Sequence, residues 1–285
     1  MNGSEATSTL DARNLAALKR LSPAERRAYF ERKLVDSKPI EVHEDEMEYY
    51  LSPELAAAQF LRLRRTMGHD EAGRRLVNEA NEVYYGENEF HVRLRHLFDF
   101  LQNTGGDVDP SVAIPPLVRK KVTIEVELHD IWHSSEVLAD FGSAQDAKSD
   151  YHDEENGEIA RWTRGRLRNV ALLTNAESIL VVLLGVGVVD GSDLGTHQTI
   201  KDIASVVRAL IGQFGGRFDI TKVLTRGQGL GGSIRSYWDR PSAEARVCVF
   251  NGWATTEQLM QVEIARWLDE DVREPGPDGL WDRLV

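Results

Sequence analysis

Residues 88–94 read NEFHVRL and mark a change in the apolar rhythm of the chain. Phe90, Val92 and Leu94 alternate there with polar residues, which is the pattern of a half-buried strand. Over residues 53–85 the apolar residues instead recur at helical spacing, as on one face of an amphipathic helix. The sequence therefore predicts helices up to about residue 86 and strands beyond it.

The first helix has a start signal in Ser22-Pro23-Ala24-Glu25. A serine at the N-cap accepts a hydrogen bond from the backbone, a proline fits the first helical position, and a glutamate at the third reaches back to the cap. We expect this helix to end near residue 35 and to bury Phe30. The acidic residues 41–48 that follow are expected to form a solvated loop. The alternative is that they bind a basic partner or a cation.

After residue 94, strand-like and helix-like stretches alternate. Strands joined by helical crossovers pair in parallel, so the pattern predicts an α+β fold in which β-α units form a mainly parallel sheet. The spacing of the strands is irregular, which leaves a leucine-rich-repeat-like array as an open alternative. We expect strands at 88–94, 122–128, 179–184, 218–224 and 246–250, helices at 97–101, 131–141, 159–173, 200–211 and 255–268, and loops at 143–157 and 225–241.

The same patterns divide the chain into four parts. Residues 1–20 form an N-terminal segment with a short helix, and residues 273–285 form a tail. Residues 21–86 form a helical head, and residues 87–272 form a β-α platform. The apolar residues 179–184, ILVVLL, are expected to lie at the centre of the sheet, covered on both faces.

Composition excludes several classes of protein. The 285 residues carry 34 Lys and Arg against 46 Asp and Glu, a net charge of −12, which argues against a protein that coats nucleic acid. The single cysteine excludes an internal disulfide framework and a cysteine-rich zinc site. The longest apolar run is too short to span a bilayer, and the first residues show no secretory signal. We expect an intracellular protein without a membrane, nucleic-acid or cofactor partner.

Two stretches resemble a known family. Residues 21–35, LSPAERRAYFERKLV, are similar to the opening helix of fungal F-box-like proteins, which carries Leu-Pro-x-Glu at its start. Residues 76–92, LVNEANEVYYGENEFHV, resemble the next landmark of that family, a helix that leads through a Tyr-Gly-x-Asn-x-Phe turn into the first strand. In that turn we expect Gly86 to close the helix and Asn88 to serve the turn.

The resemblance implies an F-box-like helical head followed by strand-helix units. Full F-box proteins link a Skp-type adaptor and a cullin ligase to a substrate. The resemblance therefore implies that the head contacts such an adaptor, and we expect Leu21, Pro23 and Phe30 to take part in that contact. A relic whose head no longer binds the adaptor is the alternative.

Three features with catalytic or ligand-binding potential favour a structural interpretation. Gly227 to Gly232 satisfy G-x-G-x-x-G, but Pro241 leaves little room for the helix of a dinucleotide site, so a connecting loop is favoured. His129 and His133 have the spacing of metal ligands on a helix but lack the glutamate of the zincin pattern. Cys248, between two valines of an expected strand, is expected to be a buried hydrophobe. We assign no catalytic, cofactor or metal residue.

Tyr237 and Trp238 form a candidate partner site. They lie in an expected loop beside Arg240, and aromatic residues and arginine are enriched in contact surfaces. Anchoring of that loop in the core is the alternative.

We expect a non-catalytic interaction or scaffold protein, possessing an F-box-like substrate-adaptor role if the resemblance holds. The alternative is a small-molecule enzyme with a site at the carboxyl ends of the parallel strands, where His129, the loop of Gly227–Gly232 and Asn251 would lie. An enzyme should bring titratable groups together in one pocket, whereas a scaffold should expose an apolar patch.

Overall fold

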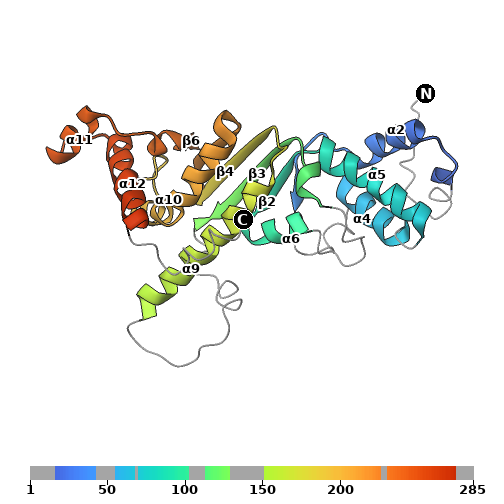
Figure 1. Ribbon diagram of the computed structural model, residues 1–285, viewed down its shortest axis with the longest axis horizontal. Coiled ribbons are helices and arrows are strands. Elements are labelled where there is room, and N and C mark those ends of the chain that lie inside the picture. Colours follow the sequence, from blue (N-terminus) through green and yellow to red (C-terminus); the bar gives the residue numbers. More distant parts are fainter. Residues whose placement is uncertain are drawn as a thin grey trace. The chain divides into compact units, whose positions relative to one another are not determined.

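The computed structural model describes residues 17–42, 55–67, 70–102, 113–128, 151–225 and 230–273, without the side chains of residues 151–158 and 270–273. These residues form an α/β fold with eight α-helices and a six-stranded, mostly parallel sheet in the order β1-β2-β3-β4-β5-β6 (Figure 1). The expected mainly parallel sheet is thereby confirmed. The helices are α2 (Pro23–Leu34), α4 (Ala56–Met67), α5 (Glu71–Glu87), α6 (Leu97–Gln102), α9 (Tyr151–Arg168), α10 (Leu194–Phe214), α11 (Ala243–Phe250) and α12 (Thr256–Arg273), and the strands are β1 (Ile40–Val42), β2 (Phe90–Arg93), β3 (Lys121–Glu127), β4 (Ser178–Gly185), β5 (Phe218–Leu224) and β6 (Gly231–Ser233).

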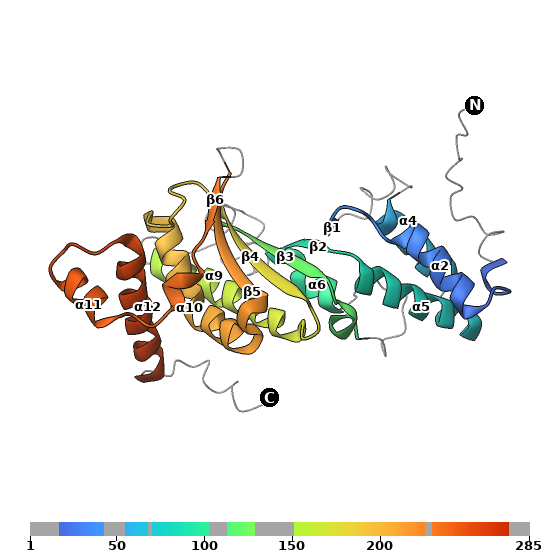
Figure 2. The same cartoon turned by 90° about the horizontal axis from the view of Figure 1, so that it is seen from above.

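The chain divides into two compact units. Unit 1 comprises Met1–Ile124 and Leu172–Ile179, and unit 2 comprises Glu125–Ala171 and Leu180–Val285. In unit 1, helices α2, α4 and α5 pack against one another and lie side by side in Figures 1 and 2. The expected helix from Pro23 is confirmed with its capping box, and Phe30 points into the core of this helical group.

A buried asparagine joins the helical ends of unit 1 to its first strands. Asn88 is 1% exposed, and its Nδ2 donates to the carbonyl oxygens of Leu34 (2.7 Å) and Tyr84 (2.8 Å). Its Oδ1 accepts from the backbone N–H of Asp36 at 2.8 Å. Asn88, and not Gly86, is the C-cap of α5, and its amide satisfies carbonyls that a helix end leaves unpaired.

Strand β1 includes Glu41 and Val42, the first two residues of the stretch 41–48 that was expected to form a solvated acidic loop. It pairs in parallel with β2, with Ile40 opposite Phe90. Because Ile40 and Phe90 are both buried, this short strand extends the sheet into the range of the predicted head. The acidic residues 43–48 lie outside the described residues.

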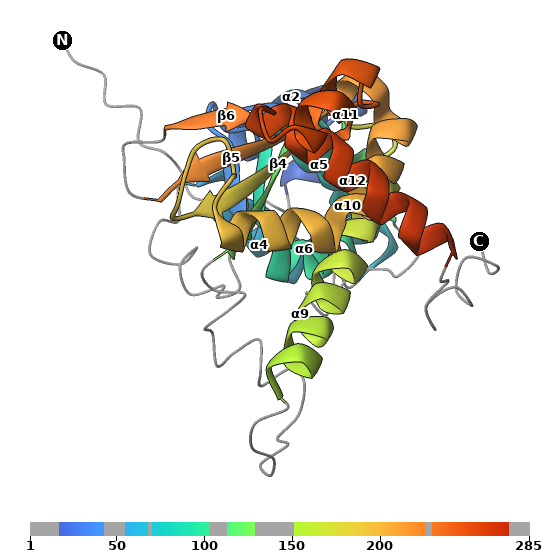
Figure 3. The same cartoon turned by 90° about the vertical axis from the view of Figure 1, so that its left-hand side faces the viewer.

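Strand β4, which begins in unit 1 and continues into unit 2, is followed by α10 and β5 as a β-α-β unit, as predicted. Strand β4 buries one face completely, through Ile179, Val181 and Leu183, whereas the intervening residues are half-buried and not fully covered as expected. Helix α10 ends at Gly215, whose φ of 58° suits glycine. It packs against both α9 and α12 (Figure 3).

Three expectations for unit 2 were wrong. Residues 246–250 form the second half of α11 and not a strand, because Ser242 caps this helix by accepting from the N–H of Ala245 at 3.0 Å. Cys248 is accordingly half-exposed on a helix. The expected loops at 143–157 and 225–241 contain the start of α9, strand β6 and a 3₁₀ helix at Arg235–Trp238. The expected helix 131–141 lies outside the described residues.

A charge on the buried face of α10 tests this packing. Ile203 is fully buried, so Ile203→Asp should lower the free energy of unfolding by about 3 kcal/mol or more through an unpaired buried charge. Ala209→Asp, on the exposed face of the same helix, is the matched control and should change it little. Denaturant unfolding measures both. Equal midpoints for the two variants would remove α10 from the core.

Candidate functional site

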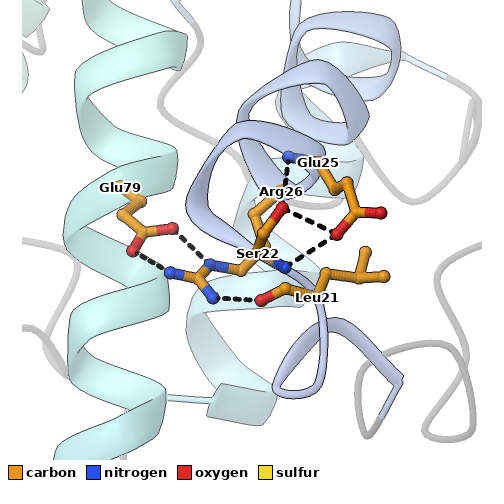
Figure 4. Close-up of polar contacts among 5 residues, drawn as sticks. All are labelled: Leu21, Ser22, Glu25, Arg26 and Glu79. Atoms are coloured by element: carbon orange, nitrogen blue, oxygen red, sulfur yellow. Dashed lines mark hydrogen bonds and ion pairs between the residues drawn. The ribbon is translucent and has the colours of Figure 1, made fainter.

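The start of α2 is a rigid corner that carries Leu21 and Pro23 (Figure 4). Ser22 Oγ accepts from the N–H of Glu25 at 3.4 Å, and the Glu25 carboxylate accepts from Ser22 N (2.8 Å) and Ser22 Oγ (2.7 Å). These bonds lower the pKa of Glu25, chiefly through the Ser22 hydroxyl. Both groups of the capping box are therefore used, which leaves the helix start well defined.

Arg26 ties this corner to α5. Its Nε and Nη2 each donate to one carboxylate oxygen of Glu79 at 2.6 Å, and its Nη1 donates to the carbonyl oxygen of Leu21 at 2.6 Å. The pair with Glu79 raises the pKa of Arg26. A bidentate pair of this kind fixes direction as well as distance, so Leu21 is held in place by its own backbone carbonyl.

The three residues predicted for the head contact differ in exposure. Pro23 is exposed and Leu21 is half-buried at the start of α2. Phe30 is 0% exposed and contributes to the interior of the helical group. Only the first two are therefore accessible to another protein in this conformation.

Tyr237 and Trp238 lie together on the 3₁₀ helix of unit 2, and both are buried. Trp238 is 1% exposed and its Nε1 donates to the carbonyl oxygen of Ala204 on α10 at 2.9 Å. Tyr237 is 5% exposed and its hydroxyl donates to the carbonyl oxygen of Asp190. This placement fits the alternative of a loop anchored in the core.

A buried lysine that sequence analysis did not single out lies in β5. Lys222 is 0% exposed, and its Nζ donates to the carbonyl oxygen of Val186 (3.0 Å) and to Thr196 Oγ1 (2.9 Å). Burial lowers its pKa, and the charge of Asp193 opposes that shift. Lys222 therefore connects β5 to the segment after β4 and to the first turn of α10.

Asp193 completes this group as the N-cap of α10. It accepts from the N–H and Oγ1 of Thr196 and from the N–H of Val188. Burial raises the pKa of Asp193, but these hydrogen bonds outweigh it and keep the pKa below its usual value. Gly187 has a φ of 103°, and a Cβ there would lie 2.3 Å from the Asp193 carboxylate, so only glycine fits.

Of the residues of the enzymatic alternative, the structure describes only the end of the glycine loop and Asn251. Gly231 and Gly232 belong to β6, which runs antiparallel to β5, so no helix opens at the third glycine as a dinucleotide site requires. A Cβ at Gly231 would lie 2.8 Å from the Lys222 carbonyl oxygen. A glycine is needed at this position because the two backbones approach each other closely. Asn251 is exposed after α11, and His129 and Gly227 lie outside the described residues.

Of the large apolar side chains exposed in unit 2, Leu194 (83%) and Leu230 (60%) stand apart in the sequence, whereas three others lie close together on α11 and the turn after it. Phe250 is 90% exposed, Trp253 is 81% exposed and Val247 is 58% exposed. We call these three residues the α11 surface. The sequence did not indicate this surface, because residues 246–250 were expected to form a strand and not a helix.

Comparisons with known proteins add no assignment. No protein-family model, curated protein or solved structure matches the chain. The described residues contain no group of three or more His, Cys, Asp or Glu side chains arranged to hold a metal ion. None of their helices has the length and apolar character needed to cross a membrane.

Because Tyr237 is buried, its phenol is expected to ionise at a higher pH than a free tyrosine. Burial, followed by the charges of Asp190 and Glu257, raises the pKa of Tyr237 from 10.0 to about 12. Between these values the unfolded chain loses the phenol proton and the folded chain keeps it, so this group makes stability fall as pH rises. Unfolding free energies should fall more steeply over this range in the wild type than in Tyr237→Phe. Equal slopes, or a Tyr237 phenolate absorbance rising near pH 10, would contradict the placement.

Proposed function

We propose that this chain is a non-catalytic protein-interaction protein whose platform binds through the α11 surface. The observation that carries the proposal is the exposure of two large aromatic side chains, Phe250 at 90% and Trp253 at 81%. Exposed aromatic residues that gather with other apolar side chains are typical of protein contact sites, where Trp and Tyr dominate the binding energy.

The titratable groups beneath the carboxyl end of β4 support a structural role rather than a catalytic one. Lys222 is 0% exposed, so a substrate has no access to its ammonium group. The carboxylate oxygens of Asp193 accept hydrogen bonds from backbone N–H groups and from the Thr196 hydroxyl. A catalytic base or nucleophile needs a side chain within reach of the substrate. Lys222 and Asp193 instead hold the first turn of α10 through their hydrogen bonds to Thr196.

We extend the proposal to the head, where Leu21 and Pro23 would contact a Skp-type adaptor in the manner of an F-box-like protein. Three helices packed together in unit 1 and an exposed Pro23 at the start of α2 support this part. The bidentate pair between Arg26 and Glu79 supports it further, because it holds that corner in one conformation. Pre-organised contact residues lose less entropy on binding.

The adaptor part of the proposal is tested with a purified Skp-type adaptor. The wild-type chain should retain the adaptor in a pull-down, and Leu21→Asp should abolish retention because a charge would replace an apolar contact. Arg32→Asp, exposed at the far end of α2, is the control and should still bind. Thermal melting of both variants establishes that they fold. A wild-type chain that retains no adaptor would contradict this part and favour the relic.

The α11 surface is tested by affinity purification of the full chain followed by mass spectrometry. Phe250→Asp combined with Trp253→Asp should remove a protein that the wild type recovers in stoichiometric amount. Ala209→Asp, which places a charge on an exposed position of α10, should recover that protein unchanged. An identical set of recovered proteins for all three chains would contradict binding of a foreign protein at this surface.

A further inference from the structure

We propose that the α11 surface is the contact between two copies of this chain, related by a two-fold axis. This inference rests on the proposed function, because it names the occupant of the same surface. In a two-fold contact the same patch serves both copies, so Val247, Phe250 and Trp253 of one copy meet the same three residues of the other.

The position of α11 leaves its outer face open. The helix packs against α12 and lies on the side of α12 away from the strands of unit 2 in both Figures 1 and 2. Ala245 is the one residue of α11 that is fully buried. An eight-residue helix is marginal on its own, so a second contact on its outer face would add stability that its inner face does not supply.

The backbone that carries the apolar side chains is held in place before any contact forms. Val247 and Phe250 are three positions apart on α11 and so share one face. The chain then turns through Gly252, with a φ of 74°, and the N–H of Trp253 donates to the Cys248 carbonyl oxygen at 2.9 Å. This turn sets the Trp253 backbone directly beside the helix end, which lowers the entropy lost on association.

The exposed area is of the size that a small two-fold contact needs. Buried aromatic side chains contribute about 150–250 Å² each, so at these exposures Phe250, Trp253 and Val247 offer roughly 450 Å² per copy. Two copies would then bury about 900 Å² of apolar surface, and the polar rim brings the contact to ~1,000 Å², the lower limit for a specific interface and the size of a weak contact that forms as concentration rises.

The charges around the patch are mixed, which suits a surface that meets itself. Exposed residues of both signs lie near it in the sequence: Arg240 and Arg246 are basic, and Asp239, Glu244 and Glu257 are acidic. The net charge of −12 of the whole chain would oppose self-association if this rim were purely acidic. With both signs present, an arginine of one copy can face a carboxylate of the other.

The test measures the mass of the purified full chain by sedimentation equilibrium across a concentration series. The wild type and Ala209→Asp should pass from one to two copies as concentration rises. Phe250→Asp combined with Trp253→Asp should weaken association roughly 100-fold or more, because both anchors are lost. The emission of Trp253 should shift to shorter wavelength in the wild-type series. If the aspartate pair fails to fold, Phe250→Ser with Trp253→Ser takes its place.

Two results would overturn the inference. A wild-type chain that stays a single copy at every concentration excludes the two-fold contact. A dimer that neither substitution weakens lies on another face. In either case, a foreign protein that is recovered only when the α11 surface is intact would still support the proposed function. If neither a dimer through this surface nor such a protein is found, both proposals are wrong.

Discussion

The buried ammonium of Lys222 is the contact on which the arrangement of unit 2 depends. It holds the segment after β4 through Val186 and the start of α10 through Thr196. The same segment contains Asp190, whose backbone carbonyl accepts from Tyr237 and whose carboxylate accepts from Thr256 at 3.1 Å. The hydrogen bonds of one buried lysine thus order the turn that positions the start of α12, and α11 packs against α12. A buried ammonium without hydrogen-bond partners would lower the free energy of unfolding. The oxygens of Val186 and Thr196 therefore lie within hydrogen-bond distance of it.

In unit 1 a neutral buried side chain, Asn88, joins separate segments of the chain through its hydrogen bonds. Asn88 serves carbonyls at the ends of both α2 and α5 at the point where β2 begins, and Arg26 with Glu79 fastens the opposite end of α2. The two contacts hold α2 at both of its ends. The exposed start of α2 is therefore a fixed surface feature, whereas Phe30 serves the interior.

Local signals predicted much of the fold. The capping box of α2, the alternation in β2 and β3, and the apolar stripe of α10 were all legible because each depends on near neighbours. Strand β1 was missed because its three residues lead into an acidic run, and only pairing with β2 makes them a strand. Residues 246–250 have strand-like composition, and the cap at Ser242 overrides it. The burial of Trp238 and the exposure of Phe250 depend on what packs against them, which sequence spacing does not encode.

If the outer face of α11 is a docking surface, amide hydrogen exchange measures that face most directly. Peptides covering residues 243–255 should exchange more slowly as the concentration of the full chain rises, while peptides from β4 stay unchanged. Protection confined to this segment would place the contact on Val247, Phe250 and Trp253. Exchange there that is independent of concentration and of any recovered protein would contradict the account.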